Sequence, residues 1–229
     1  VLVLASPGFI TEYDQLERTR TELNDRFTKL FEDNGFVLLN WGEAGKTRLF
    51  SMEPFAKPED LKRLRPWAWK DDPVFAEFVN VIGATPVRVG APEVYGGLQT
   101  RMLDTVPVSA LAAVAMQWYT RLNYMAKQNL GIIIGGSVIK SEKFYALSEY
   151  DQKVLLETSE RAARAGDKLA RRDDKRAYDS LIKRGITLVD TAPHKAAWDA
   201  AAAQTRKNLT GRLYSKSLLD AVEKVVRGD

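Results

Sequence analysis

Short apolar runs alternate along the chain with segments of helical periodicity. Five runs consist almost entirely of apolar residues: Val1–Leu4, Phe36–Leu39, Val87–Val89, Ile132–Ile134 and Ile186–Val189. Strands that are buried on both faces carry such runs, and parallel sheets are built from strands of this kind. Because helical patterns separate the runs, the chain is expected to adopt an α/β fold with mainly parallel sheets.

The segment between Glu12 and Asp33 shows the helical pattern most clearly. Apolar side chains recur there at steps of three, four and seven residues, on one face of a helix: Leu16, Leu23, Phe27, Leu30 and Phe31. Asn34-Gly35 would end this helix, since glycine suits the left-handed position after a helix.

Capping signals predict the other helices. Asp72-Pro73 can begin a helix that Gly83 ends, and Ser148-Glu149-Tyr150-Asp151 resembles a capping box. The predicted ranges are 73–82, 91 to about 102, 109–125, 148 to about 171, and two helices within 194–227 separated near Thr210-Gly211.

Composition changes this picture little but excludes several classes of protein. With 229 residues, 45% of them apolar, the chain can bury a substantial core. Its net charge of +4 is mild, and acidic residues are interspersed among the basic ones, so a solvated surface is expected and no nucleic-acid partner. No run approaches the roughly 20 apolar residues of a membrane span. The first residue is Val1, and no signal peptide is recognisable.

Catalytic and cofactor chemistry is poorly represented. There is no cysteine, and the one histidine, His194, lies at a predicted helix start without a serine in a nucleophile-elbow motif. Gly45-Lys46-Thr47 resembles half of a phosphate-binding loop, but Asn40 stands where its first glycine should be. Asp71-Asp72 and Asp173-Asp174 lack the further oxygen ligands of a calcium or magnesium site. We therefore expect no enzyme, no cofactor and no metal.

Aromatic side chains are unusually dense in one part of the chain. They are Trp41, Phe50, Phe55, Trp67 and Trp69. Any one of them alone would indicate ordinary core packing. Trp67 and Trp69, however, would point the same way on an extended segment, and indole is seldom completely buried. The pair is therefore a candidate wall of a binding cleft.

A series of short motifs resembles one family in order and spacing. They are Gly-Phe-x-Leu-Leu-x-Trp-Gly at 35–42, Leu-Phe-Ser-x-x-Pro at 49–54, Pro-Glu-Asp-Leu-Lys at 58–62, Gly-Ala-Thr-Pro-Val at 83–87, Glu-Val-Tyr at 93–95, Leu-Gln-Thr at 98–100 and Leu-Asp at 103–104. Gln117-Trp118 and the strand at 136–141 continue the similarity. Together they resemble the DctP-type solute-binding proteins of tripartite ATP-independent periplasmic (TRAP) transporters.

The resemblance implies a two-lobed periplasmic-binding-protein-like fold whose lobes close over a small solute. The expected lobes are discontinuous: 1–40 is the remainder of lobe I, 41–130 is mainly lobe II, and 131–229 contains a strand returning to the lobe interface, a long helix spanning both lobes and the C-terminal helices. Family members carry a further βαβ-rich segment before the strand matching Val1–Leu4, so the first part of lobe I is expected to be missing. The implied location is the periplasm, and the implied partners are TRAP membrane subunits.

The resemblance also implies a departure in the ligand site. Many such receptors bind carboxylates through an arginine on the strand after Pro-Glu-Asp-Leu-Lys, and here Trp67 stands at that position. Indole offers one N–H and no charge, so it cannot replace a bidentate clamp; Arg65 could substitute. We therefore expect an apolar or aromatic ligand. The expected ligand-binding residues are Trp41, Trp67, Trp69, Gln99, Asp104 and Ser109.

A second interpretation keeps the family origin without ligand transport. In it the chain is a helix-rich periplasmic interaction or scaffold module, and the charged helices from Ser148 onward form the working surface. A co-purifying small molecule would favour the receptor, and a stable ligand-free dimer would favour the module.

Overall fold

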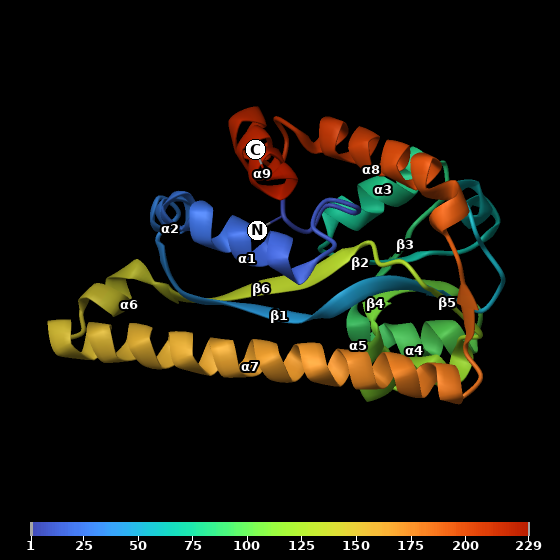
Figure 1. The fold of residues 1–229 in the computed structure, drawn as a ribbon, viewed down its shortest axis with the longest axis horizontal. Coiled ribbons are helices and arrows are strands. Elements are labelled where there is room, and N and C mark those ends of the chain that lie inside the picture. The colour runs from blue at the N-terminus through green and yellow to red at the C-terminus, as the bar shows by residue number, and fades with distance from the viewer. Residues whose placement is uncertain (1, 229) are drawn as a thin grey trace.

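A single long strand, β1 (Phe36–Ser51), runs through the centre of the computed structural model, which describes residues 2–228. Its first part pairs antiparallel with β6 (Gly131–Lys140), and its last residues pair antiparallel with β4 (Thr105–Ser109) and β5 (Tyr124–Ala126). Figure 1 shows β1 and β6 in the middle, with α7 along one side and the first and last helices on the other.

The remaining strands are short and parallel to their neighbours. β7 (Thr187–Val189) pairs with β5, and β2 (Trp67–Trp69) pairs with β3 (Val87–Val89). The expected mainly parallel sheets are therefore wrong, since the central strand has three antiparallel partners and the sheet is mixed. An apolar run reports that a strand is buried on both faces, but it carries no information on strand direction.

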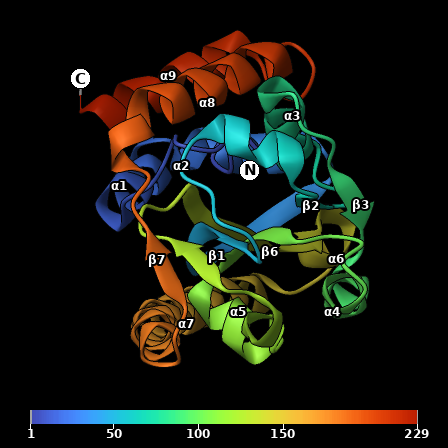
Figure 2. The ribbon, with the colours of Figure 1, turned by 90° about the vertical axis from the view of Figure 1, so that its right-hand side faces the viewer.

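Helices cover both sides of the strands. Their bounds are α1 (Tyr13–Glu22), α2 (Asn24–Glu32), α3 (Pro73–Ile82), α4 (Ala91–Gln99), α5 (Ala110–Ala115), α6 (Ser141–Tyr145), α7 (Glu149–Lys183), α8 (Lys195–Leu209) and α9 (Lys216–Arg227). Three 3-10 turns complete the structure: η1 (Pro58–Arg63), η2 (Trp118–Arg121) and η3 (Ala192–His194). In Figure 2 the strands lie between a layer with α3, α8 and α9 and a layer with α4, α5 and α7.

Several predicted helix ends are confirmed by their caps. The Asp72 carboxylate accepts hydrogen bonds from Val74 N (2.8 Å) and Phe75 N (3.2 Å), and Gly83 ends α3 with a φ of 85°. Ser148 Oγ accepts from Asp151 N at the start of α7. That helix continues to Lys183, well beyond the predicted end near residue 171, and stops before Gly185 (φ 95°).

Other predictions are corrected. Residues 2–4 form turns and not a strand, although Val3 and Leu4 are buried; Val1 lies outside the described residues. Burial alone therefore explains this apolar run. The helix predicted between residues 12 and 33 is two helices, because Leu23 leaves the helical conformation (φ −107°, ψ 12°).

Two left-handed residues that are not glycine end helices earlier than predicted. Arg101 (φ 57°) follows α4, which ends at Gln99, and Gln117 (φ 57°) follows α5. The long apolar helix expected over residues 109–125 is therefore wrong: the chain leaves α5, makes one 3-10 turn and enters β5. A glycine at either position would have indicated a left-handed residue, and without one the sequence does not predict these helix ends.

Three hydrophobic cores fill the space between these layers. One lies between the sheet and α4, α5 and α7 and includes Phe50, Trp67 and Trp118. A second, with Phe78 and Trp198, lies on the other side under α3 and α8. The third joins the N-terminal segment, α1, α2 and α9 to β6. None of the helices in residues 2–228 has both the length and the hydropathy that a membrane crossing needs.

The two parts of β1 meet at a bulge between Glu43 and Lys46. At this bulge, side chains of α7 accept the backbone hydrogen bonds that a neighbouring strand would otherwise accept. Glu43 N donates to Asp167 Oδ1 (3.1 Å), and Lys46 N donates to Asp174 Oδ2 (3.1 Å). The other oxygen of Asp174 accepts from Leu111 N at the start of α5 (3.0 Å). One buried carboxylate therefore holds the bulge, α5 and α7 together.

Buried ion pairs reinforce the same junction. Arg20 of α1 lies 3.1 Å from Asp167 and 3.6 Å from Glu43, and it donates to Gly42 O (3.0 Å). Arg171 pairs with Glu43 and Glu17. Glu17, Glu43 and Asp167 are close enough together to suggest a cation site, but each of them is already paired with the guanidinium group of Arg20 or Arg171.

Replacing Asp174 with Asn should lower the free energy of unfolding by about 1–3 kcal/mol, because an amide cannot accept two backbone hydrogen bonds with both of its ends. Urea denaturation followed by circular dichroism measures this. The neighbouring Asp173→Asn is the matched control, since Asp173 lies on the solvent side of α7 and should leave the midpoint nearly unchanged. Equal midpoints for the two variants would contradict the role given to Asp174.

Gly45→Ala should also be destabilising. Gly45 has a φ of 94°, and an added Cβ would lie 2.5 Å from Asp174 Cγ. The left-handed conformation alone costs a non-glycine residue roughly 1–2 kcal/mol. Gly42→Ala, three residues earlier, has open space around the new Cβ and should melt close to the parent protein. Thermal melts of both variants test this, and a parental melting temperature for Gly45→Ala would refute it.

Candidate functional site

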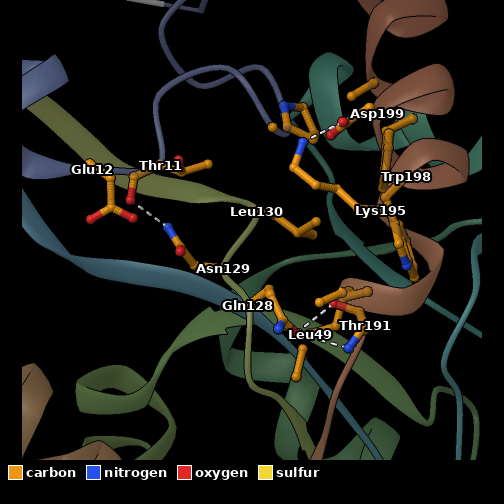
Figure 3. A pocket seen from close by; sticks show the side chains of 16 residues that line it. Thr11, Glu12, Leu49, Gln128, Asn129, Leu130, Thr191, Lys195, Trp198 and Asp199 are labelled. Carbon is orange, nitrogen blue, oxygen red and sulfur yellow. Dashed lines mark hydrogen bonds and ion pairs between the residues drawn. The ribbon is translucent and has the colours of Figure 1, made fainter.

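A cavity of about 280 Å³ lies where three distant parts of the chain meet (Figure 3). These parts are the N-terminal segment before α1, the crossover from β5 to β6, and the start of α8. The polar side chains around it are Thr11, Glu12, Gln128, Asn129, Thr191, Lys195 and Asp199. Its volume is just below the range of about 300–1,000 Å³ for drug-sized ligands, so it is suited to a smaller solute.

Hydrogen bonds fix the crossover side of the cavity. Gln128 Oε1 accepts from Thr191 N (2.8 Å) and Thr191 Oγ1 (2.9 Å), while Gln128 Nε2 donates to Asp190 (2.7 Å). Asn129 Nδ2 donates to Thr11 O (2.8 Å) and so ties the crossover to the N-terminal segment. These bonds join segments that are far apart in sequence, and therefore the cavity has a defined shape.

The same hydrogen bonds affect a neighbouring carboxylate. Ala192 N donates to Asp190 Oδ1 (3.0 Å), and this bond, followed by the one from Gln128, lowers the pKa of Asp190 below its ordinary value. The loop before α8 is thus held by an ionised side chain at neutral pH.

The opposite side of the cavity is apolar. Leu49, Phe78 and Trp198 are buried there. Trp198 stacks on Phe78 with ring centroids 6.2 Å apart, and its indole N–H donates to Ala56 O (3.0 Å). At the rim, Lys195 pairs with Asp199 one turn later. An apolar floor with a few polar groups suits binding.

Catalysis is not apparent in this arrangement. The hydroxyl groups at the cavity belong to Thr11 and Thr191, and the second of these donates to an amide oxygen. Within residues 2–228, no histidine lines the cavity to activate either of them.

The two tryptophans of the predicted pair differ in how far they are buried. Trp67 is 8% exposed, donates its N–H to Val89 O (3.0 Å), and packs edge-to-face on Trp118 at 5.3 Å. Trp69, two residues later on the same strand, is 52% exposed. Trp41 lies in the other part of β1, where its ring contacts Phe27 at 5.4 Å. The structure therefore does not bring Trp41 to the pair.

The polar candidates have structural partners. Asp104 is buried and accepts hydrogen bonds from Arg65 N (2.8 Å) and Arg65 Nε (3.4 Å). These bonds hold Arg65, the residue that could have substituted for the arginine expected at position 67. Ser109 is the N-cap of α5 and accepts from Ala112 N (3.2 Å). Gln99 is exposed at the end of α4.

Among the described residues, none of the six candidates lines the cavity in Figure 3. Gln128 and Asn129 were overlooked. Their one sequence signal is that they belong, with Lys127, to a short polar break between the apolar runs Tyr124–Ala126 and Ile132–Ile134. Polar residues at the crossover between two strands are candidates for a binding site.

Comparison with known proteins places the chain in a family. The model of bacterial extracellular solute-binding protein family 7, DctP, matches residues 1–211. The 2,3-diketo-L-gulonate-binding periplasmic protein YiaO of Escherichia coli is 27% identical over 195 residues, which are 82% of this chain and 58% of YiaO. The ectoine-binding periplasmic protein TeaA of Halomonas elongata is 30% identical over 149 residues, 61% of this chain and 41% of TeaA. The chain thus spans well under two thirds of either relative.

A solved structure shows the same fold. The TRAP periplasmic solute-binding protein of Ralstonia eutropha with bound (S)-2-acetolactate superposes with a TM-score of 0.91 at 18% identity, covering 99% of this chain and 74% of that one. The expected periplasmic-binding-protein-like architecture is confirmed by this likeness. Both the resemblance inferred from the motifs and the match over residues 1–211 lead to one conclusion: the chain belongs to the DctP family of bacterial extracellular solute-binding proteins.

Proposed function

We propose that this protein is an extracytoplasmic receptor that binds a small solute and delivers it to the membrane subunits of a TRAP-type transporter. The observation that carries the proposal is a defined cavity between three segments of a chain of this family. The relatives it matches are named as periplasmic binding proteins, and we place this chain in the periplasm with them. The receptor function requires neither catalysis nor a cofactor.

The proposed lobes follow the expected boundaries, with residues 1–40 in lobe I, 41–130 mainly in lobe II, and 131–229 shared. Two observations support this division. β1 pairs with β6 from Phe36 to Thr47 and with β4 from Thr47 to Ser51, and the bulge at Glu43–Lys46 lies just before this change of partner. α7, with 35 residues, extends past both parts. We propose that the lobes close about this bulge.

The proposed ligand is apolar or aromatic. YiaO and TeaA are named for solutes as different as 2,3-diketo-L-gulonate and ectoine, so neither name identifies the solute of this chain. Trp67 stands where an arginine clamp would be expected, and its ring is part of an apolar core. The cavity of Figure 3 likewise has an apolar floor. Of the predicted pair, Trp69 is the ring that solvent and solute can reach.

The interaction module is supported by a different observation. Tyr145, Leu147, Tyr150, Val154 and Leu156 are exposed near the start of α7. Native mass spectrometry separates the two functions, because a retained small molecule supports the receptor and a ligand-free dimer supports the module.

Indole, a neutral aromatic probe, should bind the purified chain more tightly than succinate, an aliphatic dicarboxylate. The reason is that the cavity has an apolar floor and that, among the described residues, no arginine lines it to provide the paired N–H donors that a carboxylate needs. Isothermal titration calorimetry with each probe measures the difference. Tighter binding of succinate would contradict the apolar ligand but not the receptor; failure of both probes, with no molecule retained in native spectra, would count against the receptor itself.

Thr11→Trp should abolish indole binding, because the added ring fills the cavity while the Thr11 carbonyl keeps its bond to Asn129. Trp69→Ala is the matched variant at the predicted tryptophan pair. If that pair holds the solute, its loss should weaken binding by about 1–3 kcal/mol, the contribution of a buried aromatic ring. Calorimetry of both variants shows whether the solute binds in the cavity of Figure 3 or at Trp69. Loss of binding in Trp69→Ala alone would show that the solute site is at β2.

A further inference from the structure

The long helix α7 is covered on one side only. Its main contacts are with β1 and α5, and its buried residues, Asp174, Ala177 and Leu181, all lie in its last third. Figure 1 shows α7 along the lower edge of the molecule, and Figure 2 shows it end-on at a corner beside α5. Within the part of the chain that the structure describes, no element packs on the side of α7 away from β1. A helix of about 52 Å is therefore open to a partner along its length.

The two halves of α7 carry opposite charge. Residues 149–163 have four exposed acids and two exposed bases, a net charge of −2. Residues 164–183 have a net charge of +3, which becomes +4 without the three residues that face β1 (Asp167, Arg171 and Asp174). These counts include the ion pairs within the helix, so the excess remains after pairing. The first half carries Glu149, Asp151, Glu157 and Glu160 with Lys153 and Arg161; the second carries, toward solvent, Arg164, Lys168, Arg172, Lys175, Arg176 and Lys183 with Asp173 and Asp179.

One stripe along the open side of α7 has the spacing of a coiled-coil seam. Its residues recur at alternating steps of four and three, and all are exposed except one that is half-buried, Leu155. This outer stripe consists of Asp151, Leu155, Thr158, Ala162, Ala165, Leu169, Arg172, Arg176, Asp179 and Lys183. Leu169 is 50% exposed. The stripe is therefore small and apolar in its middle, acidic at one end and mainly basic at the other.

Gly166, beside the outer stripe, is not required by the fold of a single copy. It lies in the interior of a 35-residue helix, where glycine is unfavourable relative to alanine. A Cβ added to it would have no neighbour within 4 Å among the described residues. Together with Ala162 and Ala165, it makes a place where the backbone of a second helix can approach closely.

We propose that two copies of this chain form a dimer in which their α7 helices pack antiparallel along the outer stripe. The two-fold axis passes midway between Ala162 and Ala165. Thr158 of one copy then faces Leu169 of the other, because the two residues are equally far from the axis along the sequence. Such a contact uses the same surface on both copies, as two-fold symmetry requires.

The charges of α7 select both the occupant and its direction. Antiparallel packing places the acidic half of each helix beside the basic half of the other, with Asp151 opposite Arg176, and it also opposes the two helix dipoles. Parallel packing would bring halves of like charge together. Because the surface carries both signs in this order, it is complementary to a reversed copy of itself, and a uniformly acidic or basic partner would fit only one half.

The proposed dimer goes beyond the receptor function and does not depend on it. The outer stripe shares no residue with the lining of the cavity of Figure 3, so each copy in a dimer can bind a solute. A dimer that retains a small molecule would therefore agree with both proposals, and the measurements below do not involve the solute.

Sedimentation equilibrium of the purified chain, over a roughly hundredfold range of concentration, measures the dimer. The mass should rise from that of one copy toward that of two, and association should weaken as sodium chloride is added. Ala165→Glu should raise the dissociation constant of the dimer about tenfold or more, because it places two carboxylates beside the axis. Ala200→Glu, the same change at an exposed position of α8, is the matched control and should associate like the parent.

Exchange of the facing charges tests the direction of packing. Asp151→Arg and Arg176→Asp should each weaken association, since each brings like charges together twice in the dimer. The double variant restores opposite charges and should regain most of the parent's association, a rescue that damage to the fold of one copy would not show. Glu160→Arg changes an exposed charge on the opposite side of α7 from Ala162 and should have no effect.

Circular dichroism checks the folding of each variant. Asp151 also accepts a hydrogen bond from Ser148 Oγ at the start of α7, so Ala165→Glu and Arg176→Asp carry the test if Asp151→Arg unfolds this end. A monomer at every concentration would overturn the proposal. So would a dimer that Ala165→Glu leaves unchanged, or a folded double variant that fails to regain association.

Discussion

The carboxylate of Asp174 is the interaction on which the rest of this structure depends. It reaches from α7 to the backbone of β1 where that strand is bulged, and it also binds the first turn of α5. An unpaired backbone N–H at such a buried place would be costly. By accepting two of them, one side chain allows a strand to change its neighbours partway along without losing hydrogen bonds. β6 is thus able to pair with β1 on both sides of the bulge, up to Glu43 and again at Lys46 and Thr47.

Charged residues on α7 either bind the backbone of β1 or form ion pairs within the helix, and the face on which they lie decides which. Asp167 and Asp174 are two turns apart on the face toward β1 and accept backbone hydrogen bonds. Asp173, one position away, is partly exposed and pairs with arginines of its own helix. A highly charged helix can therefore be the central structural support of a domain and not merely a solvated surface.

Features encoded locally were predictable, and features made by distant contacts were not. Asp72 and Gly83 mark the ends of α3 because each signal needs only neighbouring residues. Gln117 gave no warning of the left-handed turn that ends α5. Spacing correctly indicated that Trp67 and Trp69 share an extended segment, but it could not show that Trp118 covers one ring and leaves the other exposed. The cavity of Figure 3 was beyond prediction, since its three walls are widely separated in sequence.

The continuity of β1 has a mechanical consequence. A strand is nearly inextensible, and α7 is a stiff rod fixed to it at Asp167 and Asp174. Two rods joined at two points resist bending in the plane that contains them both. They resist torsion about their common axis much less. The proposed closure of the lobes about the bulge should therefore proceed as a twist about this axis and not as a bend.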